Sequence, residues 1–268
     1  MSTSDVDGIC EHLDVCKLGK ISDEELFKQP PPLHEDCPIC FLSMPSLNTG
    51  SKYKACCGKM ICSGCIYAPR YDDQGYKVDN KICPFCRTPT PTTEEGIVER
   101  INKLMDAGDA IAIHSRGCDY RYATYGFTQD YAKALELWHR AGELGYAEAY
   151  HGIGYAYDSG EGVEVDKKKA RHYYELAAVE GSVLARYNLG NIELHSGNFD
   201  LALKHFMIAL RSGEMDSLDT IKEMYRNDDA TKEDYMKALR LYQEYLGEIK
   251  SKQRDEAAAY NSELYQYY

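Results

Sequence analysis

The sequence predicts two folds in tandem: a small domain held together by metal-binding cysteines, and an all-α solenoid of helix-turn-helix repeats. Two observations lead to this prediction. Eight of the 11 cysteines lie in four close pairs between residues 37 and 86. Farther along the chain, alanine, aromatic and glycine residues each recur at steps of 36 or 32 residues. Clustered thiols indicate a metal site, and self-similarity at such a period is the signature of a helical repeat array.

The four cysteine pairs match the chemistry of two zinc ions. The pairs are Cys37 and Cys40, Cys56 and Cys57, Cys62 and Cys65, and Cys83 and Cys86. Four thiolates at a Zn–S distance of ~2.3 Å complete a tetrahedral site and leave no position for a water molecule. We therefore expect structural rather than catalytic zinc, and no catalytic residue among these thiols.

The order and spacing of these cysteines resemble the RING finger family, through the segments CPIC, ACCGKMICSGC and CPFC. The resemblance implies a small zinc-stabilised cross-brace domain, in which ligand pairs one and three hold one ion and pairs two and four hold the other. Lys59 stands where the family usually has a histidine ligand, and a charged amine does not bind zinc. Either Cys56 and Cys57 both serve the second ion, as in all-cysteine variants, or the domain holds one zinc only. The first set would be Cys37, Cys40, Cys62 and Cys65, and the second Cys56, Cys57, Cys83 and Cys86.

The RING resemblance also implies a surface for a ubiquitin-conjugating enzyme, which such ligases activate by positioning rather than by a nucleophile. The matching residues are Ile39, Pro84 and Arg87, with Ile66 as the nearest apolar residue on the helix after the third pair. The family often has a tryptophan there, whereas Pro69 shortens this helix. The alternative interpretation makes Ile39 a loop plug and Arg87 a solvated charge.

The repeats occupy the second half of the chain. The alanine column is Ala134, Ala170, Ala202 and Ala238, the aromatic column is Trp138, Tyr174, Phe206 and Tyr242, and the glycine column is Gly145, Gly181 and Gly213. The repeat beginning YHGIGYAYDSGEGVEVD resembles the Sel-one-like repeat, a relative of the tetratricopeptide repeat. That resemblance implies about four repeats, the last degenerate, whose concave face binds a protein or peptide partner without chemistry of its own.

These patterns divide the chain into five segments. Residues 1–35 form a polar tail with one short helix, which the capping box of Ser22 and Glu25 opens. Residues 36–91 form the zinc domain, and residues 92–108 form a connecting helix with Ile97, Ile101 and Leu104 on one face. Residues 109–250 hold the repeats. Residues 251–268 form a helical extension or tail, in which we expect Tyr260 and Leu264 to pack on the repeats.

Composition excludes several classes of function. The net charge of −12 disfavours a nucleic-acid surface, and the chain has no apolar run long enough for a bilayer. Because the polar N-terminal residues lack a secretory signal, we expect an intracellular protein, cytoplasmic or nuclear. Phosphate-binding and His-Glu-x-x-His motifs are absent. Two functions remain: a RING-type ubiquitin ligase whose repeats bind the substrate, or a non-enzymatic zinc-binding scaffold.

Overall fold

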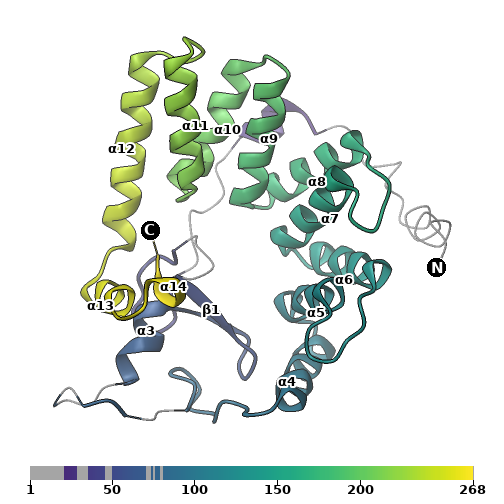
Figure 1. The fold of residues 1–268 in the computed structure, drawn as a ribbon, viewed down its shortest axis with the longest axis vertical. Helices are drawn as coiled ribbons and strands as arrows, with labels where there is room; N and C mark the ends of the chain where they lie inside the picture. Colours follow the sequence, from purple (N-terminus) through teal and green to yellow (C-terminus); the bar gives the residue numbers. More distant parts are fainter. Residues whose placement is uncertain are drawn as a thin grey trace. The chain divides into compact units, whose positions relative to one another are not determined.

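The chain forms two compact units in the computed structural model, which describes residues 21–28, 36–45, 50–70, 74, 76–78 and 81–267. The first unit comprises Met1–Pro31 and Glu94–Ile192, and the second comprises Pro32–Thr93 and Glu193–Tyr268. Figure 1 shows the elements of both. Most of the polar tail predicted for residues 1–35 lies outside the described residues, but its short helix is present.

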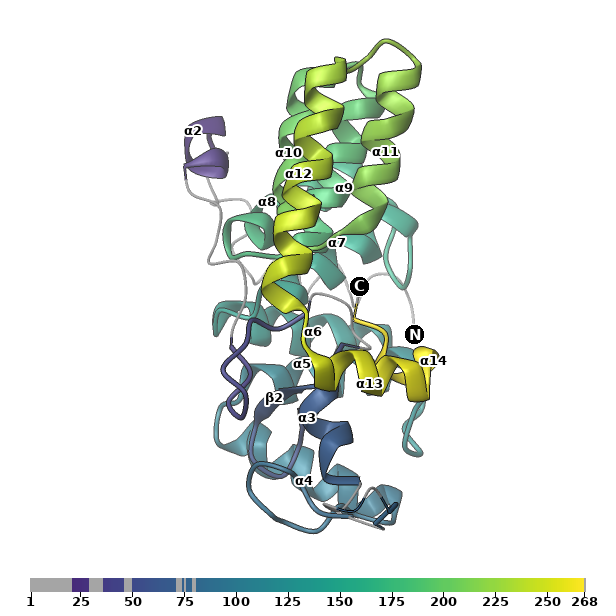
Figure 2. The ribbon, with the colours of Figure 1, turned by 90° about the vertical axis from the view of Figure 1, so that its left-hand side faces the viewer.

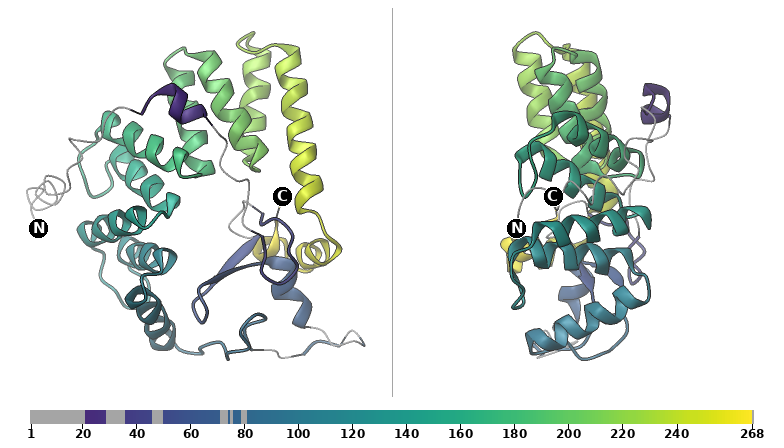
Figure 3. Two further views of the ribbon diagram at one scale, coloured as in Figure 1. Left: turned by 180° about the vertical axis from the view of Figure 1, so that it is seen from behind. Right: turned by 90° about the vertical axis from the view of Figure 1, so that its right-hand side faces the viewer.

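The first unit is a series of short helices joined by turns. From α4 to α8, each helix packs on the next one along the chain (Figure 3, left). Apart from the five-residue α2 (Asp23–Phe27), each helix has 13 residues. They are α4 (Glu94–Asp106), α5 (Ala110–Tyr122), α6 (Tyr131–Glu143), α7 (Ala147–Ser159), α8 (Lys167–Val179) and α9 (Val183–His195), of which α9 continues into the second unit. The predicted helical repeat solenoid is therefore confirmed.

The local signals in the sequence explain where these helices begin. Asp109, Asp130 and Asp166 are N-cap residues, and each accepts a hydrogen bond from the N–H three residues later at 2.9 to 3.0 Å. Such a bond satisfies one of the donors that the first turn leaves unpaired. The capping box predicted at Ser22 and Glu25 is also present and opens α2.

The three predicted columns have distinct structural roles. The glycine column lies in the turns between paired helices with φ of 87°, 105° and 94°, which is left-handed backbone that favours glycine. The alanine column is fully buried. The aromatic column is buried at its first three positions, which are Trp138, Tyr174 and Phe206. The alanine and aromatic columns thus form the core, whereas the glycine column forms the turns.

Helices in the first unit approach closely because glycine lies opposite the aromatic column. A Cβ at Gly154 would lie 2.7 Å from the Tyr174 ring, and one at Gly117 would overlap the indole of Trp138. The Trp138 indole N–H donates to the carbonyl of His114 at 3.3 Å. The same small-to-large pairing therefore recurs in successive repeats and sets their spacing.

The second unit begins its helical part with α10 (Phe199–Arg211), α11 (Met215–Arg226) and α12 (Lys232–Ile249), which pack on one another (Figure 2). We call the described part of residues 36–91 the cysteine module. It contains a hairpin of β1 (Ser51–Lys54) and β2 (Lys59–Cys62), paired from Ser51 with Cys62 to Lys54 with Lys59. The hairpin leads into α3 (Ser63–Tyr67) and a 3-10 turn, η2 (Ala68–Arg70). Pro69 lies in that turn, so α3 is short, as predicted.

The C-terminal residues form α13 (Lys252–Tyr260) and α14 (Ser262–Tyr265), and α13 packs on α3 of the cysteine module. The expectation that Tyr260 and Leu264 pack on the repeats is wrong, because both are 45% exposed. Ser251 has extended backbone and caps α13, so the chain turns at the end of α12 instead of extending it. Among the described residues after Ser251, Tyr265 and Tyr267 are the buried tyrosines.

Substitution of Gly154 by alanine is expected to lower the free energy of unfolding of the first unit by about 1–3 kcal/mol, because the new methyl group overlaps Tyr174. Gly152, in the same helix, is the matched control. Its Cβ would lie 3.4 Å from Trp138, an ordinary contact, and alanine there gains roughly 0.5–1 kcal/mol of helix propensity. The fluorescence of Trp138, the chain's single tryptophan, reports unfolding of this unit. Equal stability of the two variants would contradict the packing described above.

Acidification is expected to destabilise the first unit through three histidines on successive helices. Burial lowers the pKa of His114, His139 and His151 to about 4, whereas the unfolded value is ~6.5. Between these values the unfolded chain binds more protons, so stability is complete above pH ~6.5 and falls as the pH drops toward 4. Each histidine contributes up to about 3 kcal/mol.

The measurement is the unfolding midpoint from Trp138 fluorescence at several pH values across this window. His139→Gln should show a smaller loss on acidification than the unmodified chain. If the unfolding midpoint does not decrease as the pH is lowered from 6.5 to 4, these histidines ionise freely in the folded state.

Candidate metal centres

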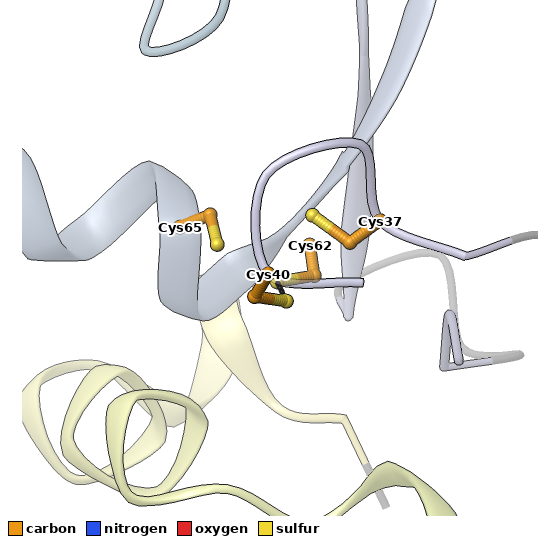
Figure 4. Close-up of side chains that lie close together, drawn as sticks. All are labelled: Cys37, Cys40, Cys62 and Cys65. Carbon is orange, nitrogen blue, oxygen red and sulfur yellow. Dashed lines mark hydrogen bonds between the residues drawn. The ribbon is translucent and has the colours of Figure 1, made fainter. Parts of the chain in front are cut away.

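The first group of thiols brings together two segments of the cysteine module. Cys37 and Cys40 lie in a loop, Cys62 ends β2, and Cys65 lies in α3 (Figure 4). Their four sulfur atoms all lie within 4.8 Å of one another, and the sulfurs of Cys40 and Cys62 are 3.8 Å apart. Three of the four side chains are buried, and Cys40 is half-buried. The group therefore lies in the interior of the module.

The second group consists of Cys56, Cys57, Cys83 and Cys86, whose sulfur atoms also lie within 4.8 Å of one another. Cys56 and Cys57 belong to the turn of the β1–β2 hairpin, in which Cys57 and Gly58 both donate their N–H groups to the carbonyl of Lys54. Gly58 has φ of 65°. This tight turn aims both neighbouring sulfurs at the same group.

The two Cys-x-x-Cys loops have the same backbone geometry. In each, the residue after the second cysteine has left-handed backbone, at Phe41 with φ of 57° and Arg87 with φ of 62°. That residue donates its N–H to the carbonyl of the first cysteine at 2.8 and 3.0 Å, and the first cysteine donates its N–H to a carbonyl five residues later, at 2.9 and 2.8 Å. A short β-bridge closes each loop. We call these loops the first knuckle (residues 36–43) and the second knuckle (residues 82–89).

The sulfur spacing suits a tetrahedral metal ion. Four sulfurs at ~2.3 Å from one ion would lie ~3.8 Å apart, close to the separations of 3.8 Å for Cys40 and Cys62 and 3.4 Å for Cys86 and Cys56. The structure assembles the two sets that the RING resemblance implies, each drawing on ligand pairs that alternate along the chain. Lys59 belongs to neither set and is exposed at the start of β2.

Electrostatics favours a cation in each group, because four neighbouring thiolates repel one another unless a positive ion lies between them. A hydrogen bond with Cys62 lowers the pKa of Cys37, whereas a hydrogen bond with Cys37 raises that of Cys65. In the second group, burial raises the pKa of Cys57 to about 11, and a hydrogen bond with Thr88 lowers that of Cys86 to about 6. A divalent ion offsets this mutual repulsion and binds the thiolate form. Each group can thus hold a soft divalent metal in a closed site.

The residues predicted to contact a conjugating enzyme lie on the knuckles and α3. Ile39 and Ile66 are half-buried against the cysteine core, Pro84 is half-buried in the second knuckle, and Arg87 is exposed directly after Cys86. The sequence analysis missed Phe41 and Phe85, two knuckle residues that are 76% and 43% exposed. Their positions beside the cysteines were the available signal, because an exposed aromatic side chain on a rigid loop often marks a contact surface.

Arg254 is a second residue that the sequence analysis missed. This residue of α13 is fully buried and donates to the carbonyls of Ser43 at 2.9 Å and Ile249 at 2.5 Å, with a longer bond of 3.4 Å to Leu42. Ser43 belongs to the first knuckle. The positive charge of Arg254 also favours the thiolate form of Cys62. The guanidinium therefore fixes the backbone around the first thiol group from a helix that is more than 200 residues away in the sequence.

The approach of α13 to α3 is close because Gly64 has no side chain. A Cβ there would lie 2.9 Å from the backbone nitrogen of Arg254. Aromatic contacts extend this interface, with ring centroids 5.3 Å apart for Tyr67 and Tyr260 and 6.0 Å for Tyr67 and Tyr265. The C-terminal helices are thus part of the folded cysteine module rather than an appendage to it.

Comparison with known proteins identifies Sel1 repeats. The Sel1 repeat family matches residues 118–146, 147–182 and 223–244, so the chain contains these repeats as predicted. The match includes the repeat predicted to be degenerate and not the one before it. A solved Sel1 repeat protein from Oxalobacter formigenes superposes with a TM-score of 0.51 at 25% identity, covering 57% of this chain and 64% of that one.

Two plant relatives carry names from ubiquitin ligation. The chain is 33% identical over 103 residues to the ERAD-associated E3 ubiquitin-protein ligase component HRD3B of Arabidopsis thaliana, which is 37% of this chain and 16% of that protein. It is 40% identical over 60 residues to the E3 ubiquitin-protein ligase GW2 of Oryza sativa subsp. indica, which is 22% of this chain and 12% of that protein. The matches thus span less than a fifth of either relative.

Among the described helices, none combines the length and apolar character needed to cross a bilayer.

Replacement of Arg254 by methionine is expected to loosen α13 from the knuckle by about 2 kcal/mol or more, because buried carbonyls lose a charged donor. Hydrogen exchange of the amides in residues 252–260 measures this as faster local opening. Lys252→Met is the matched control, since the Lys252 side chain is 90% exposed in the same helix. Equal exchange in the two variants would mean that Arg254 does not hold this interface together.

Proposed function

We propose that the chain is a RING-type ubiquitin ligase of the all-cysteine kind, in which the cysteine module recruits a ubiquitin-conjugating enzyme and the Sel1 repeats bind a substrate or partner protein. The observation that carries the proposal is the gathering of eight thiols into two groups, each of which includes the two cysteines of one of the matched knuckles. The plant relatives with ubiquitin-ligase names support a role in the ubiquitin pathway or in partner binding. The Sel1 repeats support the protein-binding part.

Zinc is the metal that best fits the two groups. Closed four-thiolate sites are typical of structural zinc, which has no geometric preference beyond a tetrahedron and carries no redox chemistry. When bound, it would lock the interleaved segments together, so that metal binding and folding of the module are coupled. We expect the first ion at Cys37, Cys40, Cys62 and Cys65, and the second at Cys56, Cys57, Cys83 and Cys86.

On α3, the residue that would contact the conjugating enzyme is Ile66. Gly64 and Tyr67 face α13, and at 100° per residue Ile66 points about 130° away from the centre of that face. The C-terminal helices therefore cover one side of α3, and Ile66 lies on another. Together with Ile39 and Pro84, it would form the apolar part of the contact surface.

Arg87 would act on the charged conjugating enzyme by positioning. Its backbone is fixed by the bond from its N–H to the carbonyl of Cys83 at 3.0 Å, while its side chain is exposed. A planar guanidinium can donate to carbonyls on two partners at once, so Arg87 would bridge the enzyme and its thioester-linked ubiquitin. Restricting that thioester to a reactive geometry accelerates transfer without a nucleophile from this chain.

The alternative function is a zinc-binding scaffold without ligase activity. The sequence of α3 favours this alternative, because the helix has no tryptophan and ends at Tyr67 before Pro69. A shallow contact surface would bind conjugating enzymes weakly or not at all. The two functions share the metal sites and differ in the effect on ubiquitin transfer.

The test uses the full chain, because α13 and α14 belong to the folded module. We expect elemental analysis to find two zinc ions per chain, and the protein to accelerate ubiquitin discharge from at least one member of a panel of charged conjugating enzymes. Ile39→Ala and Arg87→Ala should each reduce that acceleration roughly tenfold or more, or about 1.4 kcal/mol of activation free energy, with the zinc content unchanged.

Lys59→Ala is the control, because Lys59 is exposed and lies outside both thiol groups. It should keep both the zinc and the activity. A two-zinc protein that accelerates discharge from none of the carriers would overturn the ligase proposal in favour of the scaffold. A protein with one zinc would show that Cys56 and Cys57 do not both serve the second site.

A further inference from the structure

The short helix α2 is seated on the repeats of the first unit, although it precedes the cysteine module in the sequence. Leu26 is 5% exposed and belongs to the core cluster of that unit. Ile21 and Phe27 are partly buried against the same cluster, and α2 packs on α8. Asp23, Glu24 and Glu25 remain exposed. An acidic single turn is therefore held by its apolar residues.

Arg186 of α9 is the polar contact that holds this turn. It is 2% exposed, and its Nη2 donates to the Leu26 carbonyl at 2.7 Å. Its guanidinium carbon lies 5.7 Å from the centre of the Phe27 ring. Carbonyls in the last turn of a helix lack partners within the helix and carry its negative dipole end, so a cation there is favourable. Arg186 thus recognises the C-terminal end of the turn.

The surroundings of Arg186 differ from those of an ordinary structural arginine. Within the described part of the chain, its Nε and Nη1 are buried without a hydrogen-bond partner, and no carboxylate pairs with it. A buried cation with unused donors is costly unless a ligand completes its contacts. The site therefore has the character of a recognition pocket, with one apolar contact for Leu26, one aromatic contact for Phe27 and a donor for the helix end.

The hydrogen bonds that begin α2 lie within the segment itself. Ser22 and Glu25 form a complete capping box, in which Glu25 N–H donates to Ser22 Oγ and Ser22 N–H donates to Glu25 Oε2, both at 3.2 Å. The box holds the turn with local bonds alone. A peptide with this pattern keeps these bonds available and completes the turn when its leucine and phenylalanine pack on the repeats.

We infer that the surface of α8 and α9 around Arg186 is a binding site for short helices with the capping box and apolar end of Ser-Asp-Glu-Glu-Leu-Phe, and that α2 is its intramolecular occupant. A partner protein with such a turn would compete with α2 for the site. The inference deepens one half of the proposed function, the binding of a partner by the repeats, and is independent of zinc and of conjugating enzymes.

The test is titration of a fluorescein-labelled peptide of residues 21–28 with the full chain, followed by anisotropy. A chain with Leu26→Ala and Phe27→Ala has an open site and should bind the peptide saturably. The unmodified chain should bind it at least tenfold more weakly, because tethered α2 competes at an effective concentration on the order of millimolar. Adding Arg186→Met to the open chain should weaken binding at least tenfold.

Matched controls separate recognition from general damage. Arg140→Met in the open chain should leave binding unchanged, since Arg140 is an exposed residue of the same unit. A peptide with Glu24→Gln should bind like the original, and one with Leu26→Ala should not bind. The unfolding transition of Trp138 confirms that each chain is folded.

Two results would overturn the inference. One is an open, folded chain that fails to bind the peptide at millimolar concentration, and the other is binding that Arg186→Met does not change. An independent measurement is hydrogen exchange of the Leu26 amide, which donates to the Ser22 carbonyl at 2.9 Å. It should exchange faster in Arg186→Met than in Arg140→Met, and equal rates would also contradict the inference. Because no conjugating enzyme is present, failure of the ligase proposal leaves these results unaffected.

Discussion

The gathering of eight thiols into two tight groups is the constraint on which the cysteine module depends. Within each group the sulfur atoms lie within 4.8 Å of one another, and at that distance neighbouring thiolates repel strongly without a cation between them. The groups also join segments that alternate along the chain, so neither knuckle can form its group alone. The hairpin, the two knuckles and α3 therefore have to fold together, and a metal ion would couple that folding to its own binding.

The repeats are held together by a different kind of constraint, the fit of aromatic rings against glycine. Trp138 lies where Gly117 leaves room, and Tyr174 lies where Gly154 does. Each helix pair buries its apolar face on the next pair, which gives a rigid scaffold whose surface can vary. On this scaffold the site of α2 requires only an arginine and a few apolar contacts.

Two buried arginines play parallel roles in the two units. Arg186 and Arg254 are almost fully buried, and each donates to backbone carbonyls of a segment more than 150 residues away in the sequence. A guanidinium with several donors can satisfy the backbone carbonyls of a helix end or a loop that have no partner in regular secondary structure. In the first unit the bound segment is a short helix that a partner could replace. In the second it is the knuckle beside a thiol group, so the same chemistry stabilises a candidate metal site.

The sequence by itself determined the elements with strong local or periodic signals. The capping box of Ser22 and Glu25, the repeat columns and the Cys-x-x-Cys loops all depend on short-range chemistry, and each was recognisable before the structure. Only the tertiary structure decided where Arg186, Arg254 and the C-terminal tyrosines lie. An arginine in an amphipathic helix looks like a surface residue, because its burial depends on carbonyls supplied by a remote segment. The tail containing Tyr260 and Leu264 likewise carried no signal of its partner, since packing on α3 follows from Gly64 and Tyr67, which lie far away in the sequence.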